Sequence, residues 1–370
     1  MRFYMDYNAS APIYDDAFNM MMDVQKYVGN PSSIHASGRK VKSIIEDARD
    51  NIGNLLDCNS QDIVFTSGAT EANTLVSNFT MNHNVIISAI EHPSILNQFN
   101  NPKFISVGEN GIISINHLEE LLKNIESDYK IVSVMAVNNE TGIIQPLEEV
   151  SKLCRKYNAL FHVDAVQAIG RIPISISSLN IDLLTISSHK VGGPKGSGCL
   201  ILRENIKNKF KPLIKGGGQE RGFRAGTEAV AEIAGFGKAI ELASNMTINN
   251  TLDSRNYLED KLKDNLKDII IIGENSNRVS NTSAISIKGV SAKKLVIALD
   301  LEGFEVSSGS ACSSGKVSDS HVLVAMGLDK SIVEGALRIS LCEPLSKKNI
   351  GHFSDVLCKI VYRFKNYDVR

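Results

Sequence analysis

The sequence has no long apolar run and no excess of charge of either sign. None of its apolar segments approaches the roughly 20 residues that a helix needs to cross a bilayer, which argues against an integral membrane protein. Its 40 basic and 41 acidic residues leave a formal net charge of −1, so no global field indicates binding to nucleic acid or to anionic lipid. Residues 1–6 form neither the core of a signal peptide nor an arginine-rich presequence. We therefore expect a cytoplasmic protein, or else a mature form.

Cysteine and histidine are present but lack the spacings of disulfide frameworks and metal sites. The six cysteines include no C-x-x-C pair, and the eight histidines include no H-x-x-x-H or H-x-H pair. We expect free thiols and no zinc site. Five cysteines lie in apolar or helical segments and are predicted to pack in the core: Cys58, Cys154, Cys199, Cys342 and Cys358. Cys312 lies among serines and glycines instead, which predicts an exposed and mobile loop.

The length of 370 residues could hold two domains of ordinary size. From residue 62 onward, short apolar segments alternate with helical patterns, which is typical of a largely parallel sheet covered on both faces. The predicted strands are Ile63–Thr66, Val85–Ser88, Phe104–Val107, Ile131–Val137, Leu160–Val163, Leu183–Ser187 and Cys199–Leu202. The predicted fold class is therefore α/β.

Helical patterns lie before, between and after these strands. The predicted apolar faces are Tyr14, Ala17, Phe18, Met21 and Met22 in a first helix, and Val41, Ile44, Ile45, Ala48, Ile52, Leu55 and Leu56 in a second. Further helices are predicted at Leu147–Tyr157 and from Gly226-Thr227 to about Met246. A polar stretch at residues 247–250 then indicates a domain junction.

We predict a large domain of residues 14–248 and a smaller α+β domain of residues 1–13 and 249–370. The smaller domain is expected to contain helices Leu252–Leu266, Ala292–Leu301 and Lys347–Phe364, and strands Ala284–Ile287 and Arg338–Leu341.

The segment from Thr185 to Lys190 is the first sign of chemistry. It ends an apolar run, and the glycine-rich segment 192–198 follows directly. A lysine held among apolar and hydroxyl groups loses its proton more easily and can attack carbonyls. Taken alone, however, the segment is more typical of a surface lysine after a strand.

Two further strand ends carry unusual polar residues. Residues 66–71 form a turn of small residues into a helix, which presents free amides to a phosphate, although a helix-capping box would have the same letters. Asp164 follows a buried strand, where a carboxylate needs a cation or a donor. Ligands of open α/β sheets bind at the carboxyl ends of the strands. A lysine for an aldehyde, an aspartate for a ring nitrogen and a phosphate turn together meet the requirements of pyridoxal phosphate.

Eight motifs, in order along the chain, resemble those of the class V, fold-type I pyridoxal-phosphate enzymes. Within that class they resemble the NifS/IscS-like cysteine desulfurases used in iron–sulfur cluster assembly. The motifs are NPSSIH (30–35), TSGATE (66–71), EHP (91–93), VNNETG (137–142), HVDAVQ (162–167), SSHK (187–190), GGGQER (216–221) and SSGSACSSG (307–315). The resemblance covers nearly the whole chain and implies the fold-type I architecture, with a mostly parallel sheet covered by helices in the large domain.

The resemblance also implies a role for each matching residue. Lys190 would bind the cofactor aldehyde as a Schiff base, Asp164 would pair with the ring nitrogen, and His92 would stack on the ring. Lys190, His92 and Cys312 would be catalytic. The other implied cofactor contacts are Asn139 and Gln167 at the phenolic oxygen, Ala69, Thr70, Ser187 and His189 at the phosphate, and Thr227 at the phosphate of the other subunit of a homodimer.

Arg338 and Asn139 are assigned to the substrate. Arg338 resembles the arginine that binds the substrate carboxylate by two hydrogen bonds, although without the resemblance a surface salt bridge would be the better interpretation. Cys312 resembles the nucleophile, which needs a thiolate and a flexible tether, and its loop matches the desulfurase group with the longer loop. Two positions depart from the family: Lys215 replaces a common histidine, and Ser10 replaces a threonine, which we expect to be silent.

The implied reaction takes sulfur from L-cysteine and leaves L-alanine and a persulfide on Cys312. The persulfide would pass to an iron–sulfur scaffold protein or to a sulfur carrier for tRNA or cofactor thiolation. The resemblance implies no metal of the chain's own, with Cys312 as the residue that could be shared with a cluster on a scaffold partner. We expect no direct binding to nucleic acid and no binding to membranes.

Other interpretations stay open at this point. A selenocysteine lyase or a class V aminotransferase would have the same fold, although an aminotransferase has no use for the Cys312 loop. A catalytically silent docking protein would be expected to lose Lys190 or Cys312, and both are present. A nucleotide-binding Rossmann protein is disfavoured because no G-x-G-x-x-G follows the first predicted strand.

Overall fold

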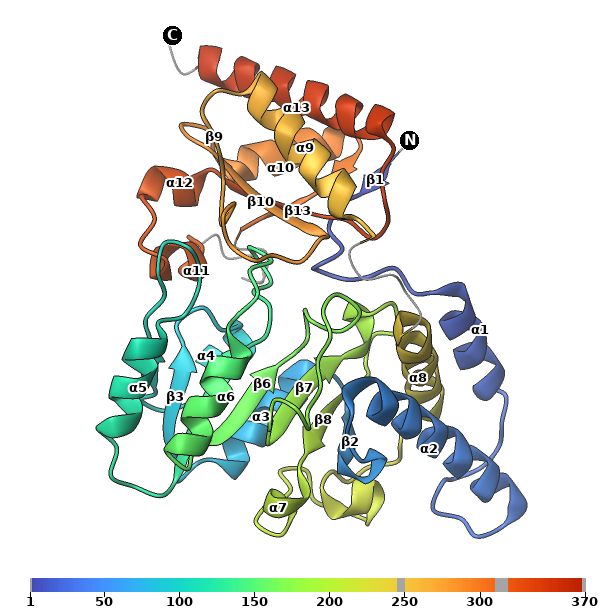
Figure 1. The fold of residues 1–370 in the computed structure, drawn as a ribbon. Helices are drawn as coiled ribbons and strands as arrows, with labels where there is room; N and C mark the ends of the chain where they lie inside the picture. The colour runs from blue at the N-terminus through green and yellow to red at the C-terminus, as the bar shows by residue number, and fades with distance from the viewer. Residues whose placement is uncertain (1, 245–249, 310–318, 368–370) are drawn as a thin grey trace.

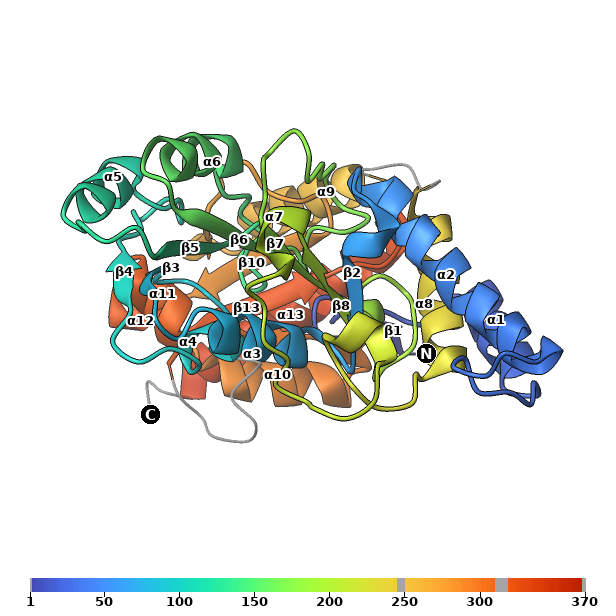
Figure 2. The ribbon, with the colours of Figure 1, turned by 90° about the horizontal axis from the view of Figure 1, so that it is seen from below.

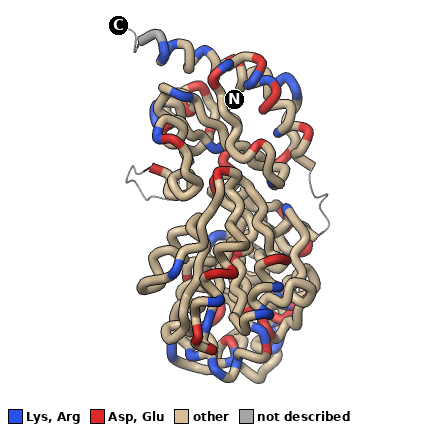
Figure 3. Tube along the Cα trace, turned by 60° about the vertical axis from the view of Figure 1, so that its left-hand side comes forward, with Lys and Arg blue, Asp and Glu red and all other residues tan. Residues whose placement is uncertain are grey.

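The computed structural model describes residues 2–244, 250–309 and 319–367. They form two bodies, a larger one below and a smaller one above in Figure 1. Basic and acidic residues are interspersed along the chain traces of both bodies (Figure 3), and the formal net charge of the whole chain is −1. No helix in the described ranges is long and apolar enough to span a membrane.

The larger body is built on a seven-stranded sheet in the order β2-β8-β7-β6-β5-β3-β4. Its strands are β2 (Ile63–Thr66), β3 (Asn84–Ser88), β4 (Lys103–Ile105), β5 (Lys130–Met135), β6 (Leu160–Asp164), β7 (Leu183–Ser187) and β8 (Gly198–Leu202). The neighbours from β7 to β4 are parallel, whereas β8 runs antiparallel to both β2 and β7. The predicted α/β class and all seven predicted strands are confirmed, with bounds that differ by no more than two residues.

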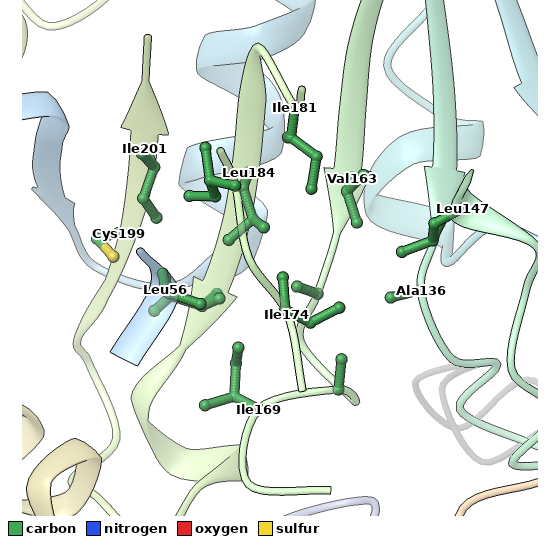
Figure 4. Packing of buried hydrophobic residues seen from close by; sticks show 14 of the residues in the cluster. Leu56, Ala136, Leu147, Val163, Ile169, Ile174, Ile181, Leu184, Cys199 and Ile201 are labelled. Atoms are coloured by element: carbon green, nitrogen blue, oxygen red, sulfur yellow. The ribbon is translucent and has the colours of Figure 1, made fainter. Parts of the chain in front are cut away.

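Helices cover both faces of this sheet. Consecutive strand residues point to opposite faces, so Leu183 packs in the cluster formed with α3 (Ala69–Phe79), while Leu184 packs in the cluster that includes α6 (Leu147–Lys156). Figure 2 shows α5 (Ile115–Lys123) and α6 on one side of the sheet and α3 on the other. Figure 4 shows the α6 side, where Val163, Leu184 and Ile201 lie in one apolar layer. Burial on both faces explains why these strands are continuous apolar runs.

Three further helices pack beside the sheet: α1 (Asp15–Val24), α2 (Ala36–Leu56) and α8 (Val230–Ser244). The predicted face of α2 is largely confirmed, since Val41, Ile45, Ala48, Ile52 and Leu56 are buried and Ile44 and Leu55 are partly buried. The predicted face of α1 is wrong at two positions, because Phe18 is 44% and Met22 45% exposed. Only Ala17 and Val24 of α1 are buried, because α8 covers a narrow stripe of this outer helix.

The smaller body has an antiparallel sheet in the order β12-β13-β10-β9. Its elements are α9 (Leu252–Asn265), β9 (Ile269–Ile271), β10 (Thr282–Ile287), α10 (Ala292–Leu301), β11 (Phe304–Glu305), β12 (Ser307–Ser308), α11 (His321–Ala325), α12 (Lys330–Glu334), β13 (Ala336–Ser340) and α13 (Lys347–Tyr367). The predicted helices and strands of this region are confirmed within three residues. Short helices elsewhere are α4 (Pro93–Leu96), α7 (Glu204–Lys207) and the 3-10 turns Ser60–Asp62, Ser188–Lys190 and Gln219–Gly222.

The N-terminal residues belong to the smaller body and then cross to the larger one. Strand β1 (Phe3–Tyr4) pairs with β11, and Met5 packs in the apolar cluster of the smaller body. Residues 5–11, which we call the N-terminal strap, lead from there to Ala11, whose amide donates to the His189 carbonyl at 2.8 Å. This path supports the predicted division into residues 14–248 and residues 1–13 with 249–370, which stays a prediction.

A buried ion pair fixes the start of β2, the strand that leads to the turn at residues 66–71. The side chains of Arg49 in α2 and Glu220 are 4% and 2% exposed and form a salt bridge. Arg49 Nη1 also donates to the Ile63 carbonyl at 2.6 Å, and Glu220 Oε2 accepts from the Phe65 amide at 2.8 Å. Glu220 adopts a left-handed backbone with φ 47°. The ion pair therefore links α2, β2 and a strained corner of the chain.

Glu220→Gln should lower the free energy of unfolding by about 3–5 kcal/mol, because the buried charge of Arg49 loses its buried partner and keeps only the partly exposed Glu46. Denaturant titration measures the loss. Glu46→Gln is the control, since Glu46 contacts the same Arg49 at 3.3 Å but is 37% exposed, and it should cost less than about 1 kcal/mol. Similar small losses in both variants would contradict the role given to Glu220.

Candidate active site

A cavity of about 590 Å³ lies where several strands and loops of the larger body end. Nine of the ten predicted cofactor-binding residues line it: Ala69, Thr70, His92, Asn139, Asp164, Gln167, Ser187, His189 and Lys190. They come from positions as far apart in the chain as 69 and 190, and the parallel strands bring them to one edge of the sheet. Asn8, Ala9 and Ser10 of the N-terminal strap complete part of the wall.

The start of α3 forms one end of the cavity. Gly68 precedes the helix with φ 152°, and as a glycine it has no side chain to cap the helix. The first amides of the helix therefore stay available to an anion, and the helix dipole favours negative charge there. The Glu71 carboxylate also lies at this turn, where its Oε2 accepts from the Ser67 amide at 2.8 Å and Arg224 Nε donates to its Oε1 at 2.8 Å, so Arg224 balances its charge. This end of the cavity suits a phosphate group.

Asp164 lies at the end of β6 and is only 5% exposed. Its Oδ1 accepts from the Val166 amide at 3.0 Å, and its Oδ2 accepts from Asn73 Nδ2 at 3.2 Å. Burial raises the pKa of Asp164, while these hydrogen bonds and the nearby His92 and Lys190 lower it in part. A protonated ring nitrogen placed in the cavity would give this carboxylate the cationic partner that burial requires.

Two histidines in the wall are kept neutral. Burial lowers the pKa of His92, and it lowers the pKa of His189 to about 4 with help from Lys190 and Lys195. His92 Nδ1 accepts from the Ser94 amide at 3.1 Å, which holds the flat ring in place for stacking. Nδ1 of His189 lies 3.3 Å from the hydroxyl of Ser10, a group that serine shares with the threonine usual at this position.

Lys190 is held by the N-terminal strap. It follows β7 within a 3-10 turn, and its Nζ donates to the carbonyls of Asn8 at 2.6 Å and Ala9 at 2.7 Å. Its amine therefore lies at the cavity wall, within the same space as Asp164 and the start of α3. A lysine, a buried carboxylate and an anion-binding helix end in one cavity fit pyridoxal phosphate.

Three predicted site residues are not placed in the cavity wall. Arg338 is 1% exposed, and it contacts Asp6 Oδ1 through Nη2 at 2.7 Å and the Asn139 carbonyl through Nη1 at 3.0 Å. Thr227 is exposed and does not line the cavity of its own chain. Cys312 lies outside the described residues. The roles given to all three stay predictions.

Two residues that shape the site, Asn73 and Asn8, were not predicted from the sequence. Asn73 holds Asp164, and its position one helical turn after Ala69 and Thr70 could have indicated it. Asn8 is 1% exposed, and its carbonyl accepts from Gln167 Nε2 at 2.9 Å as well as from Lys190. Nothing in the local sequence distinguishes Asn8, since its partners lie far along the chain.

The described cysteines and acidic residues form no second reactive or metal-binding cluster. Cys58, Cys154, Cys199, Cys342 and Cys358 are all free. Cys154, Cys199 and Cys358 are buried, as predicted, whereas Cys58 and Cys342 are only partly buried. In the ranges that the structure covers, no group of three or more His, Cys, Asp and Glu is arranged to hold a metal ion.

Asn73→Ala should weaken the binding of pyridoxal phosphate by about ten- to a hundredfold, because a hydrogen bond to a buried charged group contributes about 1.5–3 kcal/mol. Titration of the cofactor-free protein, followed by absorbance, measures the dissociation constant. Asn78→Ala is the control, since Asn78 lies in the same helix and donates to the Lys211 carbonyl at 3.1 Å instead of to Asp164. An unchanged constant in the Asn73 variant would remove Asn73 from the site.

Comparison with known proteins agrees with this geometry. The profile of the aminotransferase class-V family matches residues 3–353. The cysteine desulfurase IscS of Dictyoglomus turgidum is 36% identical over 379 aligned positions, which span 98% of this chain and 95% of that protein. A cysteine desulfurase of a Nostoc species is also 36% identical, over 98% of this chain and 93% of its own length. The solved structure of a NifS-like protein from Rickettsia africae matches with a TM-score of 0.88 and 37% identity, over 99% of this chain and all of that one.

Both the matched family and the fold-type I architecture agree with the resemblance found in the motifs. The matches extend over nearly the full length of the chain and of its relatives. The chain therefore belongs to the class-V aminotransferase family and, within it, to the NifS/IscS-like cysteine desulfurases.

Proposed function

We propose that the protein uses pyridoxal phosphate to remove sulfur from L-cysteine, with L-alanine and a persulfide on Cys312 as products. The observation that carries this proposal is the single cavity in which Lys190, Asp164 and the start of α3 meet. The names of the relatives support the same activity.

Each group in the cavity would have a distinct task. When bound, pyridoxal phosphate withdraws electrons from the substrate and so eases loss of its α-proton and of its sulfur. Ala69, Thr70, Ser187 and His189 would hold the phosphate, and Asn139 and Gln167 would contact the phenolic oxygen. Asp164 would keep a proton on the ring nitrogen, and His92 would stack on the ring face. The Lys190 amine would hold the aldehyde carbon before substrate arrives and would then accept the α-proton at Nζ.

The transfer of sulfur from the substrate to Cys312 needs no external oxidant or reductant. The Cys312 thiolate attacks the sulfur of the substrate, so that an S–S bond forms while the carbon–sulfur bond breaks. The electron pair of the broken bond stays with the substrate carbon, which then takes up a proton to give alanine. The thiol of Cys312 becomes a persulfide, and one sulfur atom has moved from substrate to enzyme.

Arg338 is the proposed partner of the substrate carboxylate, as a buried guanidinium that can make two parallel hydrogen bonds. Its present partner Asp6 is 20% exposed, so a substrate carboxylate that reaches Arg338 would compete with a carboxylate of the chain itself. The Asn139 carbonyl on Nη1 would hold the guanidinium in place during that exchange.

We propose further that the protein is a homodimer in which Thr227 completes the phosphate site of the other subunit. Exposed apolar side chains support a contact surface near the loop that carries Thr227, because Val28 is 87% and Ile34 90% exposed, and the neighbouring Pro31 and Ser32 line one groove with Glu228. The proposed acceptors are an iron–sulfur scaffold protein or a sulfur carrier. A cytoplasmic location is consistent with the free thiols of the five described cysteines.

Replacing Lys190 with alanine should abolish the covalent cofactor adduct, because the Lys190 amine is the group proposed to bind the aldehyde carbon. The purified variant should show no borohydride-stable adduct by mass spectrometry, whereas the wild type should. Lys195→Ala is the control, since Lys195 also lines the cavity but is predicted to play no covalent part. A stable adduct in the Lys190 variant would show that another lysine binds the cofactor.

Cys312→Ser should abolish alanine and sulfide production while cysteine still binds, because an isolated serine hydroxyl is barely ionised and is a weak nucleophile. After cysteine is added, the wild type should gain about 32 Da, the mass of one sulfur atom on a nucleophilic thiol, and the variant should not. Cys342→Ser controls for the loss of a partly buried thiol. Turnover at the wild-type rate in the Cys312 variant would favour the lyase or aminotransferase interpretation instead.

A further inference from the structure

The described chain on the far side of Cys312 begins at Asp319 and enters α11 through Ser320. Ser320 stands eight positions after Cys312 and is 3% exposed. Helix α11 belongs to the smaller body and lies at its lower edge, next to the larger body (Figure 1). The position of Ser320 therefore sets the point at which the segment that carries Cys312 is attached to the described structure.

Ser320 is held by a carboxyl group of the larger body. Its hydroxyl donates to Glu140 Oε2 and also accepts from the Leu323 amide at 3.1 Å, so one hydroxyl both caps α11 and binds Glu140. Glu140 is 5% exposed and follows Asn139 directly in the chain. Gly309, the last described residue before the Cys312 segment, is also close, since a Cβ built on it would lie 3.4 Å from Glu140 Oε2. Glu140 thus lies beside both ends of that segment.

His321, the first residue of α11, also contacts the larger body. His321 Nε2 lies 2.9 Å from the carbonyl oxygen of Glu91 and can donate to it. Glu91 directly precedes His92, and its own Oε1 accepts from the Met135 amide of β5 at 2.6 Å. Ser320 and His321 therefore bind two residues of the larger body, and each of these is the chain neighbour of a residue in the cavity wall.

We propose that Glu140 is a positioning residue for the sulfur step, which acts by fixing Ser320, and with it the attachment of the Cys312 segment, relative to Asn139 and His92. This inference rests on the proposed function, in which Cys312 attacks the substrate sulfur. It adds to that function a carboxyl group that contacts neither cofactor nor substrate. Seven residues separate Ser320 from Cys312, so the contact anchors one end of the tether and does not hold the thiol itself. Without this anchor, the thiol should reach the substrate sulfur in a productive geometry less often.

The contact between Glu140 and Ser320 can be tested with substitutions that keep or remove the acceptor oxygen of Glu140. Burial raises the pKa of Glu140 to about 7, although Ser320 and Arg338 oppose the rise. A neutral side chain that still offers an acceptor oxygen should therefore serve nearly as well as glutamate. Glutamine provides that oxygen and alanine does not.

The holoenzyme is mixed with L-cysteine in a single turnover. Absorbance reports cysteine binding at the cofactor, and mass spectrometry of quenched samples reports the persulfide on Cys312. Glu140→Ala and Ser320→Ala should each slow persulfide formation by about ten- to a hundredfold while the first absorbance change keeps its wild-type rate. Glu140→Gln should stay within about threefold of the wild type, since it keeps the acceptor oxygen. The double variant should be no slower than the slower single one, because both changes break the same contact.

Ser286→Ala is the matched control, since the Ser286 hydroxyl is buried in the smaller body and donates to the Ile332 carbonyl at 2.7 Å, away from the cavity. It should leave both rates unchanged. If Glu140→Ala does not fold, Ser320→Ala alone decides the question. Persulfide formation at the wild-type rate in Ser320→Ala, or equal slowing of both measured steps, would overturn the inference. Wild-type turnover in Cys312→Ser would instead overturn the proposed function, and the inference with it.

Discussion

The site depends on a carboxylate that is buried at the end of a central strand. Asp164 is 5% exposed, and water cannot compensate its charge there. Asn73 of α3 and the Val166 amide donate to it without bringing a positive charge, so a cationic partner in the cavity would complete its environment. Because β6 pairs with both β5 and β7, Asn139 and Lys190, which follow those two strands, lie at the same edge of the sheet as Asp164.

The second constraint is the N-terminal strap, which binds both bodies at once. The backbone amide of Asn8 donates to the Ser340 hydroxyl at 3.0 Å, and its side-chain Nδ2 donates to Thr282 Oγ1 at 2.9 Å. Both partners lie in the smaller body. Its carbonyl accepts from Lys190 and Gln167 in the larger body. A displacement of the smaller body would therefore act on Lys190, the amine proposed to bind the cofactor.

Contacts between the bodies meet at the loop that follows β5. The Asn139 carbonyl accepts from Arg338 Nη1 and from Asn8 Nδ2, and Glu140 accepts from Ser320. Arg338, which is proposed to bind the substrate, the N-terminal strap and the attachment of the Cys312 segment thus all contact one short stretch of chain. A buried polar network of this kind is costly when only partly satisfied, so it favours a single arrangement of the two bodies.

The sequence by itself determined the sheet and most of the cavity wall. Strands buried on both faces are short apolar runs, and the polar residues that follow them, such as Asp164 and Lys190, must meet at one edge because parallel strands end there. Only the tertiary structure decided which stripe of α1 is covered, that Asn8 holds Lys190, and that Arg338 is paired with Asp6. Those contacts join residues that are up to 332 positions apart in the chain. A local sequence pattern shows whether a side chain is apolar or charged, but it does not show which distant group the folded chain brings next to it.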